Sequence, residues 1–418
     1  MGLSPDGANG IVDPSNAALS GSQGETTQSP PTGTNHLFAN NVRFLAMVAI
    51  IGMHTMEVYP AGPIANQYPI QFFKFGTIGF FLVSGFLFGE RIDRYTSAQY
   101  FGRRLKNVFL PWCVWFLLYC CLRLAADVLH GRISFDPSLL YGRIYAASSS
   151  GLFETAYWFV PNLMIAMGVL LLLRRKLRDS RVGFTFLLLS LFYAANIYGG
   201  WITVKHSRAA FGFIFYLWLG AWAAWNFAKV ERWLLRIPGA VMVGLIVLTN
   251  AVALGEAKLL FSLHSVDPLN TLRITNQVAS VVVVLGILKL KHAVWPRFVE
   301  VRAQTFGLYL THTIALVLLF PVLVRILPLI APWEYWRRLP SAMMLLPVMF
   351  VLAYGGSLLV VRCVLAEPRL RWAVGLAGSA DSGSARRKRK VEMISMGNPI
   401  SAGFPVTAKG LAPLAGSK

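Results

Sequence analysis

Long apolar stretches separated by short polar segments run along the chain from about residue 38 to residue 365. Their length, about 20 residues, is what an α-helix needs to cross a hydrocarbon core of roughly 30 Å. A transmembrane β-barrel would instead alternate polar and apolar positions in segments of about ten residues. The pattern therefore predicts an all-α fold, a polytopic transmembrane helical bundle of about ten spans. The expected spans are residues 41–59, 72–89, 108–129, 157–173, 183–200, 209–228, 238–254, 272–290, 305–327 and 341–365.

Polar tails are expected on both sides of this membrane domain, which we place at residues 38–372. Residues 1–37 are rich in Ser, Gly, Pro, Thr and Asn, and they lack the basic and apolar regions of a cleavable signal peptide. Residues 373–418 are rich in Gly and Ser and contain a basic run at 386–390. Both compositions are typical of disordered segments. Between the spans, residues 130–156 contain the small polar run SSSG at 148–151 and are expected to form the longest external loop.

The net charge of the chain is +21, although only 14% of its residues are charged and 56% are hydrophobic. In a soluble protein this charge would suggest a nucleic-acid partner. Here the basic residues lie mainly in the short loops 90–107, 174–182, 229–237 and 289–304. Basic loops stay on the cytoplasmic side of a membrane. The distribution therefore predicts cytoplasmic termini, contact with the lipid bilayer and no nucleic-acid partner. The location that we expect is a bacterial inner membrane.

The four cysteines are Cys113, Cys120, Cys121 and Cys363. They lie in apolar segments, without metal-binding or paired extracellular spacing. We interpret them as small core residues and expect no metal site.

An ionisable side chain lies inside the first expected span. His54 follows Arg43 by eleven residues. Eleven helical steps of about 100° return to nearly the same face and rise roughly 16 Å. With Arg43 at the membrane surface, His54 would lie about halfway across the hydrocarbon core. A histidine at this depth is costly and often functional, so His54 is a candidate general base or acyl-accepting nucleophile. A structural hydrogen bond between helices is the other interpretation.

An acidic residue accompanies this histidine on the same helix. Glu57, three residues after His54, can share its face and orient the imidazole ring. The alternative role of Glu57 is that of an interfacial acid at the external end of the span.

The second expected span contains many small residues. Ser84 and Gly85 lie in the segment GTIGFFLVSGFLFG, residues 76–89. Small side chains permit either close helix packing or the close approach of a flat ligand to the backbone. On chemistry alone, packing is favoured.

A basic cluster precedes the third expected span. Arg103, Arg104 and Lys106 lie just before Pro111 and Trp112. Guanidinium and ammonium groups at a membrane surface suit phosphate groups. The preference of basic residues for cytoplasmic loops would also produce such a cluster.

A second histidine is expected near the start of the ninth span. The segment FGLYLTHT, residues 306–313, contains Tyr309 and His312. His312 would help to line a central cavity or would form a structural hydrogen bond between helices.

The order of these segments resembles the integral membrane acyltransferase-3 family. The resemblance rests on an Arg-x10-His first helix followed by GFFLVSGF, RRLKNVFLPW, YWFVPNLM and GLYLTHT, and it extends from about residue 38 to 365. Members of the family transfer acyl groups, usually acetyl and sometimes succinyl, from cytoplasmic acyl-CoA to sugars of polysaccharides, lipopolysaccharide, glycans or antibiotics. The resemblance implies that His54 is the catalytic histidine and Arg43 its partner. It also implies that Arg103 and Arg104 belong to a basic motif near the donor site.

One segment departs from the family pattern. Many members carry a glutamate in the segment that matches YWFVPNLM, where this chain has Asn162, four residues after Trp158. A second acid or base is therefore unassigned, with Glu57 and Glu154 as candidates by position. The residues expected to bind substrate are Trp158, Asn162, Tyr309 and His312.

The expected function is that of a membrane O-acyltransferase. It would move an acetyl group from acetyl-CoA, a donor substrate and not a permanently bound cofactor, to a sugar hydroxyl of a lipid-linked or exported glycan. The phosphates of the donor would meet Arg103, Arg104 and Lys106. Its pantetheine arm would pass Ser84 and Gly85. Polysaccharide-assembly machinery is a candidate partner.

Two other classes of protein fit part of this pattern. A transporter or flippase of a lipid-linked sugar would also place ten helices around a polar cavity. Such proteins often carry inverted repeats, and the two halves of this chain show no convincing repeat. A scaffolding membrane protein would not require Arg43 and His54 on one helical face.

Overall fold

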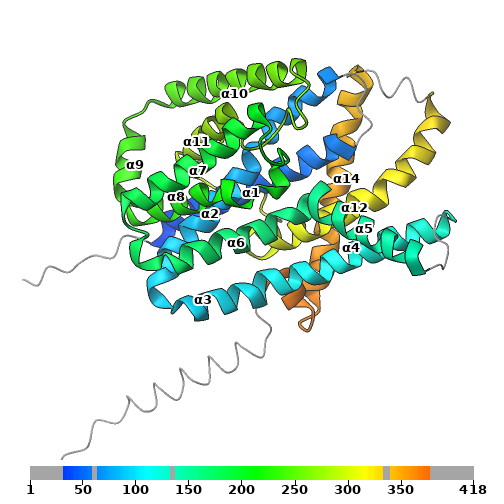
Figure 1. Cartoon of the computed structure of the whole chain (residues 1–418), viewed down its shortest axis with the longest axis horizontal. Coiled ribbons are helices and arrows are strands. Elements are labelled where there is room, and N and C mark those ends of the chain that lie inside the picture. Colours follow the sequence, from blue (N-terminus) through cyan, green and yellow to red (C-terminus); the bar gives the residue numbers. More distant parts are fainter. Residues whose placement is uncertain (1–31, 59–63, 132–136, 333–338, 377–418) are drawn as a thin grey trace, which may run out of the picture.

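A computed structural model describes residues 32–58, 64–131, 137–332 and 339–376 of the chain. This part of the chain is helical and contains no strand, so the predicted all-α bundle is confirmed. Most helices run along the long axis of the molecule, and α14 (Leu339–Ala366) crosses them steeply (Figure 1). The tail residues 1–31 and 377–418 lie outside the described residues.

The apolar helices correspond to the ten predicted spans. Seven described helices are long and apolar enough to cross a membrane, and two bent pairs raise this number to nine. The remaining predicted span, 272–290, contains the 15-residue helix α11 (Ile274–Leu288), which is shorter than a typical span. Besides α14, the long helices are α1 (Thr32–Val58), α2 (Phe75–Arg91), α3 with α4 (Ser97–Arg104 and Leu110–Leu129), α7 (Ser180–Gly199), α10 (Gly239–Ser262) and α12 (Val301–Ile330). The bent pairs are α5 with α6 (Pro137–Glu154 and Phe159–Leu172), at 74°, and α8 with α9 (Ile214–Trp225 and Phe227–Leu235), at 87°.

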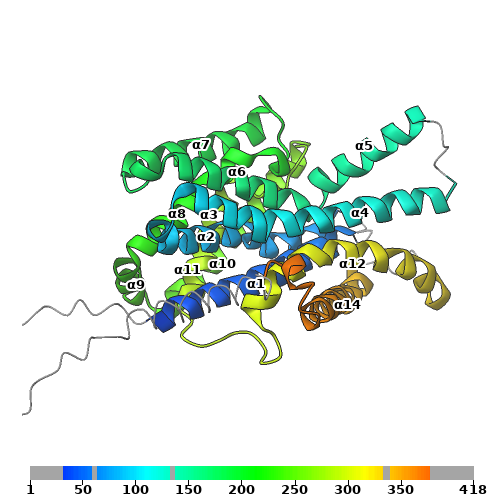
Figure 2. The same cartoon turned by 90° about the horizontal axis from the view of Figure 1, so that it is seen from below.

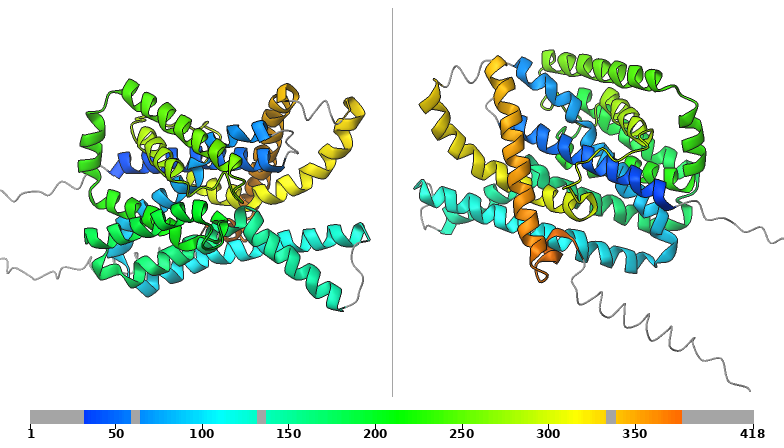
Figure 3. Two further views of the ribbon diagram at one scale, coloured as in Figure 1. Left: turned by 45° about the horizontal axis from the view of Figure 1, so that its top comes forward. Right: turned by 180° about the vertical axis from the view of Figure 1, so that it is seen from behind.

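Helix α5 occupies most of the segment that was predicted to be an external loop, so this prediction is wrong. The small residues around Ser150 suggested a loop, but they permit close packing instead. Gly151 faces the aromatic rings of Phe116 and Tyr119 on α4, and a Cβ at this position would lie 2.7 Å from Tyr119. Helices α4 and α5 project from the bundle at the same end as the C-terminal part of α12 (Figure 3).

Helix α2 lies in the middle of the bundle, where it packs against α1, α8 and α11 (Figure 2). Its contact with α8 is reciprocal, because Gly85 lies against the carbonyl group of Leu217 and Gly220 lies against that of Leu82. A Cβ at Gly85 or Gly220 would lie 1.9 or 2.1 Å from the facing carbonyl oxygen. Small residues allow membrane helices to approach in this way. The glycines of α2 therefore serve packing, as the sequence favoured.

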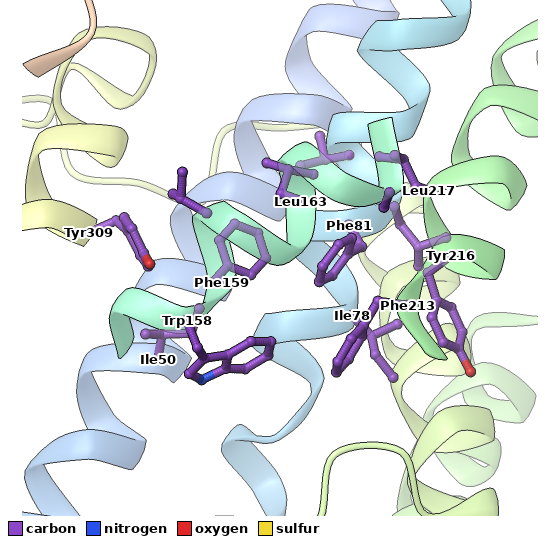
Figure 4. Packing of buried hydrophobic residues seen from close by; sticks show 14 of the residues in the cluster. Ile50, Ile78, Phe81, Trp158, Phe159, Leu163, Phe213, Tyr216, Leu217 and Tyr309 are labelled. Atoms are coloured by element: carbon purple, nitrogen blue, oxygen red, sulfur yellow. The ribbon is translucent and has the colours of Figure 1, made fainter. Parts of the chain in front are cut away.

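An aromatic cluster fixes α6 against α2. The ring of Phe81 on α2 lies 4.9 Å from that of Phe159 on α6 and 4.8 Å from that of Phe213, as measured between ring centroids. Phe213 belongs to the short turn η8 (Ala210–Phe213) that leads into α8. Trp158 lies in the same buried cluster, next to Phe159 (Figure 4). The cluster therefore holds the start of α6 at the centre of the molecule.

The chain beyond α14 folds back onto the bundle. The indole N–H of Trp115 donates a hydrogen bond to the carbonyl of Ala373, at 2.9 Å, and Val374 is buried. Ordered packing therefore continues past the predicted domain end at residue 372. Gly375 has a φ of 81°, and a Cβ there would lie 2.7 Å from the carbonyl oxygen of Asn107. Pro111 cannot donate the usual helical hydrogen bond to this carbonyl, and the helix forms a π-turn at Leu105–Phe109.

The outer faces of the bundle expose large apolar side chains. Leu117 on α4, Val243 on α10 and Val351 on α14 are each more than half exposed. Such surfaces are unfavourable in water but not against lipid tails, whereas the backbone polar groups are satisfied within the helices. The surface chemistry agrees with the membrane location predicted from the sequence.

The glycine contact between α2 and α8 leads to a stability prediction. Gly85→Ala should lower the unfolding free energy by about 1–3 kcal/mol or more, because its methyl group overlaps the carbonyl of Leu217. The matched control is Gly244→Ala on α10, where no atom lies within 4 Å of the added Cβ. Unfolding temperatures of the detergent-purified proteins provide the measurement. Equal temperatures for the two variants would contradict the packing role of Gly85.

Candidate active site

His54 forms a hydrogen-bonded pair with Glu57 at the C-terminal end of α1. Nδ1 of His54 lies 2.8 Å from Oε2 of Glu57, one helical turn away. The side chain of His54 is 15% exposed and that of Glu57 is 40% exposed. Because a carboxylate accepts the hydrogen bond, Nδ1 carries a proton and Nε2 of the neutral ring retains a lone pair. The pair thus has the arrangement of a base or nucleophile oriented by an acid.

A buried lysine completes the charge balance of this pair. Nζ of Lys74 lies 3.8 Å from Oε1 of Glu57. Lys74 is 2% exposed and lies between the turn η2 (Ile64–Phe73) and α2. An unpaired ammonium group would be costly at this position. The carboxylate of Glu57 therefore serves both the imidazole and the ammonium group.

The second predicted histidine lies beside the first. The imidazole rings of His54 and His312 are 5.5 Å apart, and His312 is fully buried on α12. Its Nδ1 donates to the carbonyls of Tyr309, at 2.7 Å, and Leu308, at 3.2 Å. Since carbonyl groups only accept, Nε2 of His312 carries the lone pair. Among the described residues this buried Nε2 has no hydrogen-bond partner.

A cavity of about 340 Å³ is lined in part by Tyr309, whose ring contacts that of His312. Phe80, Phe159 and Tyr309 contribute apolar surface to its wall. Tyr309 contacts both the ring of Phe159, at 5.6 Å, and that of His312, at 5.9 Å. Neither His54 nor His312 lines the cavity. Tyr309 therefore links the wall of the cavity to the two histidines through its contact with His312.

Four arginines converge on this cavity from separate helices. Arg43 comes from α1, Arg91 from α2, Arg104 from α3 and Arg302 from the start of α12. Arg43 is close enough to the other three to interact with them electrostatically, and it donates a hydrogen bond to Asn40. From the sequence, Arg91 and Arg302 were interpreted only as basic residues of cytoplasmic loops, because nothing in the sequence connects them with Arg43. Guanidinium groups gathered in this way are chemically suited to binding an anion.

Of the other residues predicted to bind the donor, only Ser84 lines the cavity. Gly85 faces α8 instead. The guanidinium group of Arg103 lies on the ring of Tyr95, 4.4 Å from its centroid, and donates to its hydroxyl group at 3.0 Å. Lys106 is exposed and does not line the cavity.

The predicted substrate residues of α6 have structural partners. Trp158 is buried, and its ring lies 5.2 Å from the ring of His206. The side-chain amide of Asn162 donates a hydrogen bond to the carbonyl of Ser207, at 3.1 Å. Both residues therefore contact the loop before α8 that carries His206.

This loop contains a charged pair that sequence reasoning missed. Nδ1 of His206 lies 2.8 Å from Oδ2 of Asp267, which belongs to the connection between α10 and α11. Burial alone would raise the pKa of Asp267, but the charge and hydrogen bonds of His206, with help from Lys74, lower the pKa to about 2. The two residues lie in separate loops, 61 positions apart, and no pattern in the sequence relates them.

Residues 36–363 match the family model of an acyltransferase domain, Acyl_transf_3. The match covers most of the chain, which therefore belongs to the acyltransferase-3 family of integral membrane acyltransferases. The resemblance drawn from the sequence is confirmed, and the protein is an acyltransferase with multiple helical spans. The family implies an acyl donor and an acceptor. No curated protein and no solved structure matches the chain.

The lowered pKa of Asp267 leads to a prediction on pH-dependent stability. The folded-state pKa lies below the ordinary value of 3.8, so the carboxylate stabilises the fold above about pH 4 and this contribution is lost as the pH falls toward 2. Asp267→Asn should cost on the order of 2 kcal/mol at pH 6–7. Unfolding temperatures measured between pH 3 and pH 7 should show the difference from the wild type shrinking at the acidic end. A difference that stays constant across this range would contradict the ion pair.

Proposed function

We propose that this acyltransferase moves an acetyl group from cytoplasmic acetyl-CoA to a hydroxyl group of a sugar in a lipid-linked or exported glycan. The observation that carries the proposal is the convergence of four arginines on one cavity, whose wall residue Tyr309 contacts His312, the neighbour of His54. The proposal includes a bacterial inner-membrane location with the arginine side facing the cytoplasm. Machinery for polysaccharide assembly is the expected source of the acceptor.

The donor site is supported by charge and shape. CoA carries a diphosphate and a separate phosphate group, and guanidinium groups bind phosphate oxygens in pairs and keep their charge. Arg43, Arg91, Arg104 and Arg302 are the proposed partners of these phosphates. Beyond them, the pantetheine arm would pass Phe80, Phe159 and Tyr309 to bring the thioester to His54. Arg103 and Lys106, which lie outside the cavity, would contribute only to the general positive potential around its entrance.

His54 is the proposed catalytic residue. Its Nδ1 donates a hydrogen bond to Glu57, so Nε2 retains the lone pair that would take part in the reaction. As a base, Nε2 would take the proton of the acceptor hydroxyl group while the oxygen attacks the thioester. As a nucleophile, it would first carry the acyl group itself. In either route Glu57 orients the ring and stabilises the positive charge that develops on it.

The catalytic role of His54 is tested directly by substitution. His54→Ala should lower the transfer of labelled acetyl from acetyl-CoA to membrane glycan by about 10²–10⁴-fold, the usual worth of a general acid or base. His130→Ala, at the exposed end of α4, is the matched control and should keep wild-type activity. Undiminished acylation by a correctly inserted His54→Ala protein would overturn the proposal.

The donor site is tested by removing single guanidinium groups. Arg104→Gln and Arg302→Gln should each raise the KM for acetyl-CoA by about 10–100-fold, because a charged hydrogen bond contributes roughly 1.5–3 kcal/mol. Arg103→Gln is the matched control, since its side chain packs on Tyr95 outside the cavity, and its KM should change less than about threefold. If the KM for the acceptor rises instead, or if Arg103→Gln has the larger effect, the donor lies elsewhere.

A further inference from the structure

A second histidine–carboxylate pair has the same local design as the first. His206 and Asp267 join Nδ1 to a carboxylate oxygen at 2.8 Å, as His54 and Glu57 do. The side chain of His206 is 21% exposed and that of Asp267 is 18% exposed. Because a carboxylate only accepts hydrogen bonds, Nδ1 of the neutral ring carries the proton and Nε2 retains the lone pair. Within the described part of the chain, no hydrogen bond engages Nε2 of His206.

The surrounding residues hold this pair rigidly. The carboxylate of Asp267 also accepts hydrogen bonds from the side-chain amide of Asn270, at 3.0 Å, and from the backbone N–H of His206, at 3.4 Å. The amide of Asn270 donates in addition to the carbonyl of Val204, at 2.7 Å, which joins the two loops. Trp158 packs against the imidazole ring at 5.2 Å. A fixed ring with one free nitrogen is the arrangement of an oriented base.

The two pairs belong to one polar cluster. Lys74 lies 3.8 Å from Glu57 and also acts electrostatically on Asp267. His206 in turn acts electrostatically on Glu57. The partly exposed side chains of both pairs are therefore neighbours at the C-terminal end of α1. An acceptor that reaches His54 from this end also meets His206.

The chemistry of acyl transfer through His54 requires a second base. When Nε2 of His54 carries the acyl group, Nδ1 still donates its hydrogen bond to Glu57. The ring then has no lone pair with which to accept a proton from the acceptor. A sugar hydroxyl group is a weak nucleophile until a base removes its proton. We propose that His206, oriented by Asp267, is the general base that activates the acceptor hydroxyl group, an inference that rests on the proposed function and assigns His54 the role of acyl carrier.

The two half-reactions balance as follows. In the first, Nε2 of His54 attacks the thioester carbonyl carbon, the C–N bond forms, the C–S bond breaks, and the CoA thiolate takes a proton from water. In the second, Nε2 of His206 takes the proton of the acceptor hydroxyl group while its oxygen attacks the acyl carbon. The C–O bond forms, the C–N bond breaks, and the electron pair returns to Nε2 of His54. The proton on His206 then passes to water at the loop surface.

Hydroxylamine separates the two half-reactions, because this strong nucleophile attacks an acyl-imidazole without a base. The full-length protein in membranes of its source organism is supplied with labelled acetyl-CoA. Labelled glycan and acetohydroxamate are then measured with and without hydroxylamine, with protein-free samples giving the background. His206→Gln should lower glycan acylation by about 10²–10⁴-fold and leave acetohydroxamate formation within about threefold of the wild type. His130→Gln, on α4, is the matched control and should change neither product.

Each contrary outcome has a distinct meaning. If His206→Gln keeps normal glycan acylation, or loses acetohydroxamate formation as well, His206 is not the acceptor base. A wild-type protein that acylates glycan but forms no acetohydroxamate lacks the acyl carrier, which also overturns this inference. If His54→Ala retains both products, it is the proposed function of His54 that fails.

Discussion

The backbone contact between α2 and α8 is the constraint on which the positions of all other groups depend. Gly85 and Gly220 bring the two helices closer than any side chain would permit, and Gly76 brings α2 close to α1, where a Cβ would lie 2.8 Å from the carbonyl oxygen of Ala46. Dispersion and close packing, rather than the hydrophobic effect, hold membrane helices together. Because α2 carries Lys74 at one end and Arg91 at the other, this tight packing fixes the distance between the histidine cluster and the arginine cavity.

Buried charges supply the second level of order. Arg273 is fully buried at the start of α11, where its guanidinium group bonds to the carbonyls of Ala253 and Asn270 and to the side chain of Gln71. A charge in this environment is tolerated only when its donors are satisfied. The network therefore ties η2, α10 and α11 together. The carbonyl of Asn270 accepts a hydrogen bond from Arg273, and the side-chain amide of Asn270 donates one to the carboxylate of Asp267. Stability in this region and the orientation of His206 thus rest on the same hydrogen bonds.

The sequence predicted the parts of the structure that depend on local periodicity. The ten apolar segments, the Arg43–His54 helix and the proximity of Glu57 to His54 all follow from the spacing of residues along one helix. The sequence did not predict features that depend on contacts between distant segments. Ser and Gly near residue 150 indicated a loop because their role in packing against Tyr119 is visible only in three dimensions. Arg302 and the His206–Asp267 pair were missed because their partners come from other helices and loops.

The position of Tyr309 has a consequence for the permeability of the membrane to ions and protons. Its ring lines the arginine cavity and also lies against His312, so one side chain touches both the cavity and the histidine cluster. On the proposed mechanism only the acyl group passes this point, and the thin pantetheine arm that carries it fills the gap that it opens. The protein therefore has no need for the alternating opening of a transporter. On that mechanism it would hand a chemical group across the bilayer while the ion and proton gradients on either side stay intact.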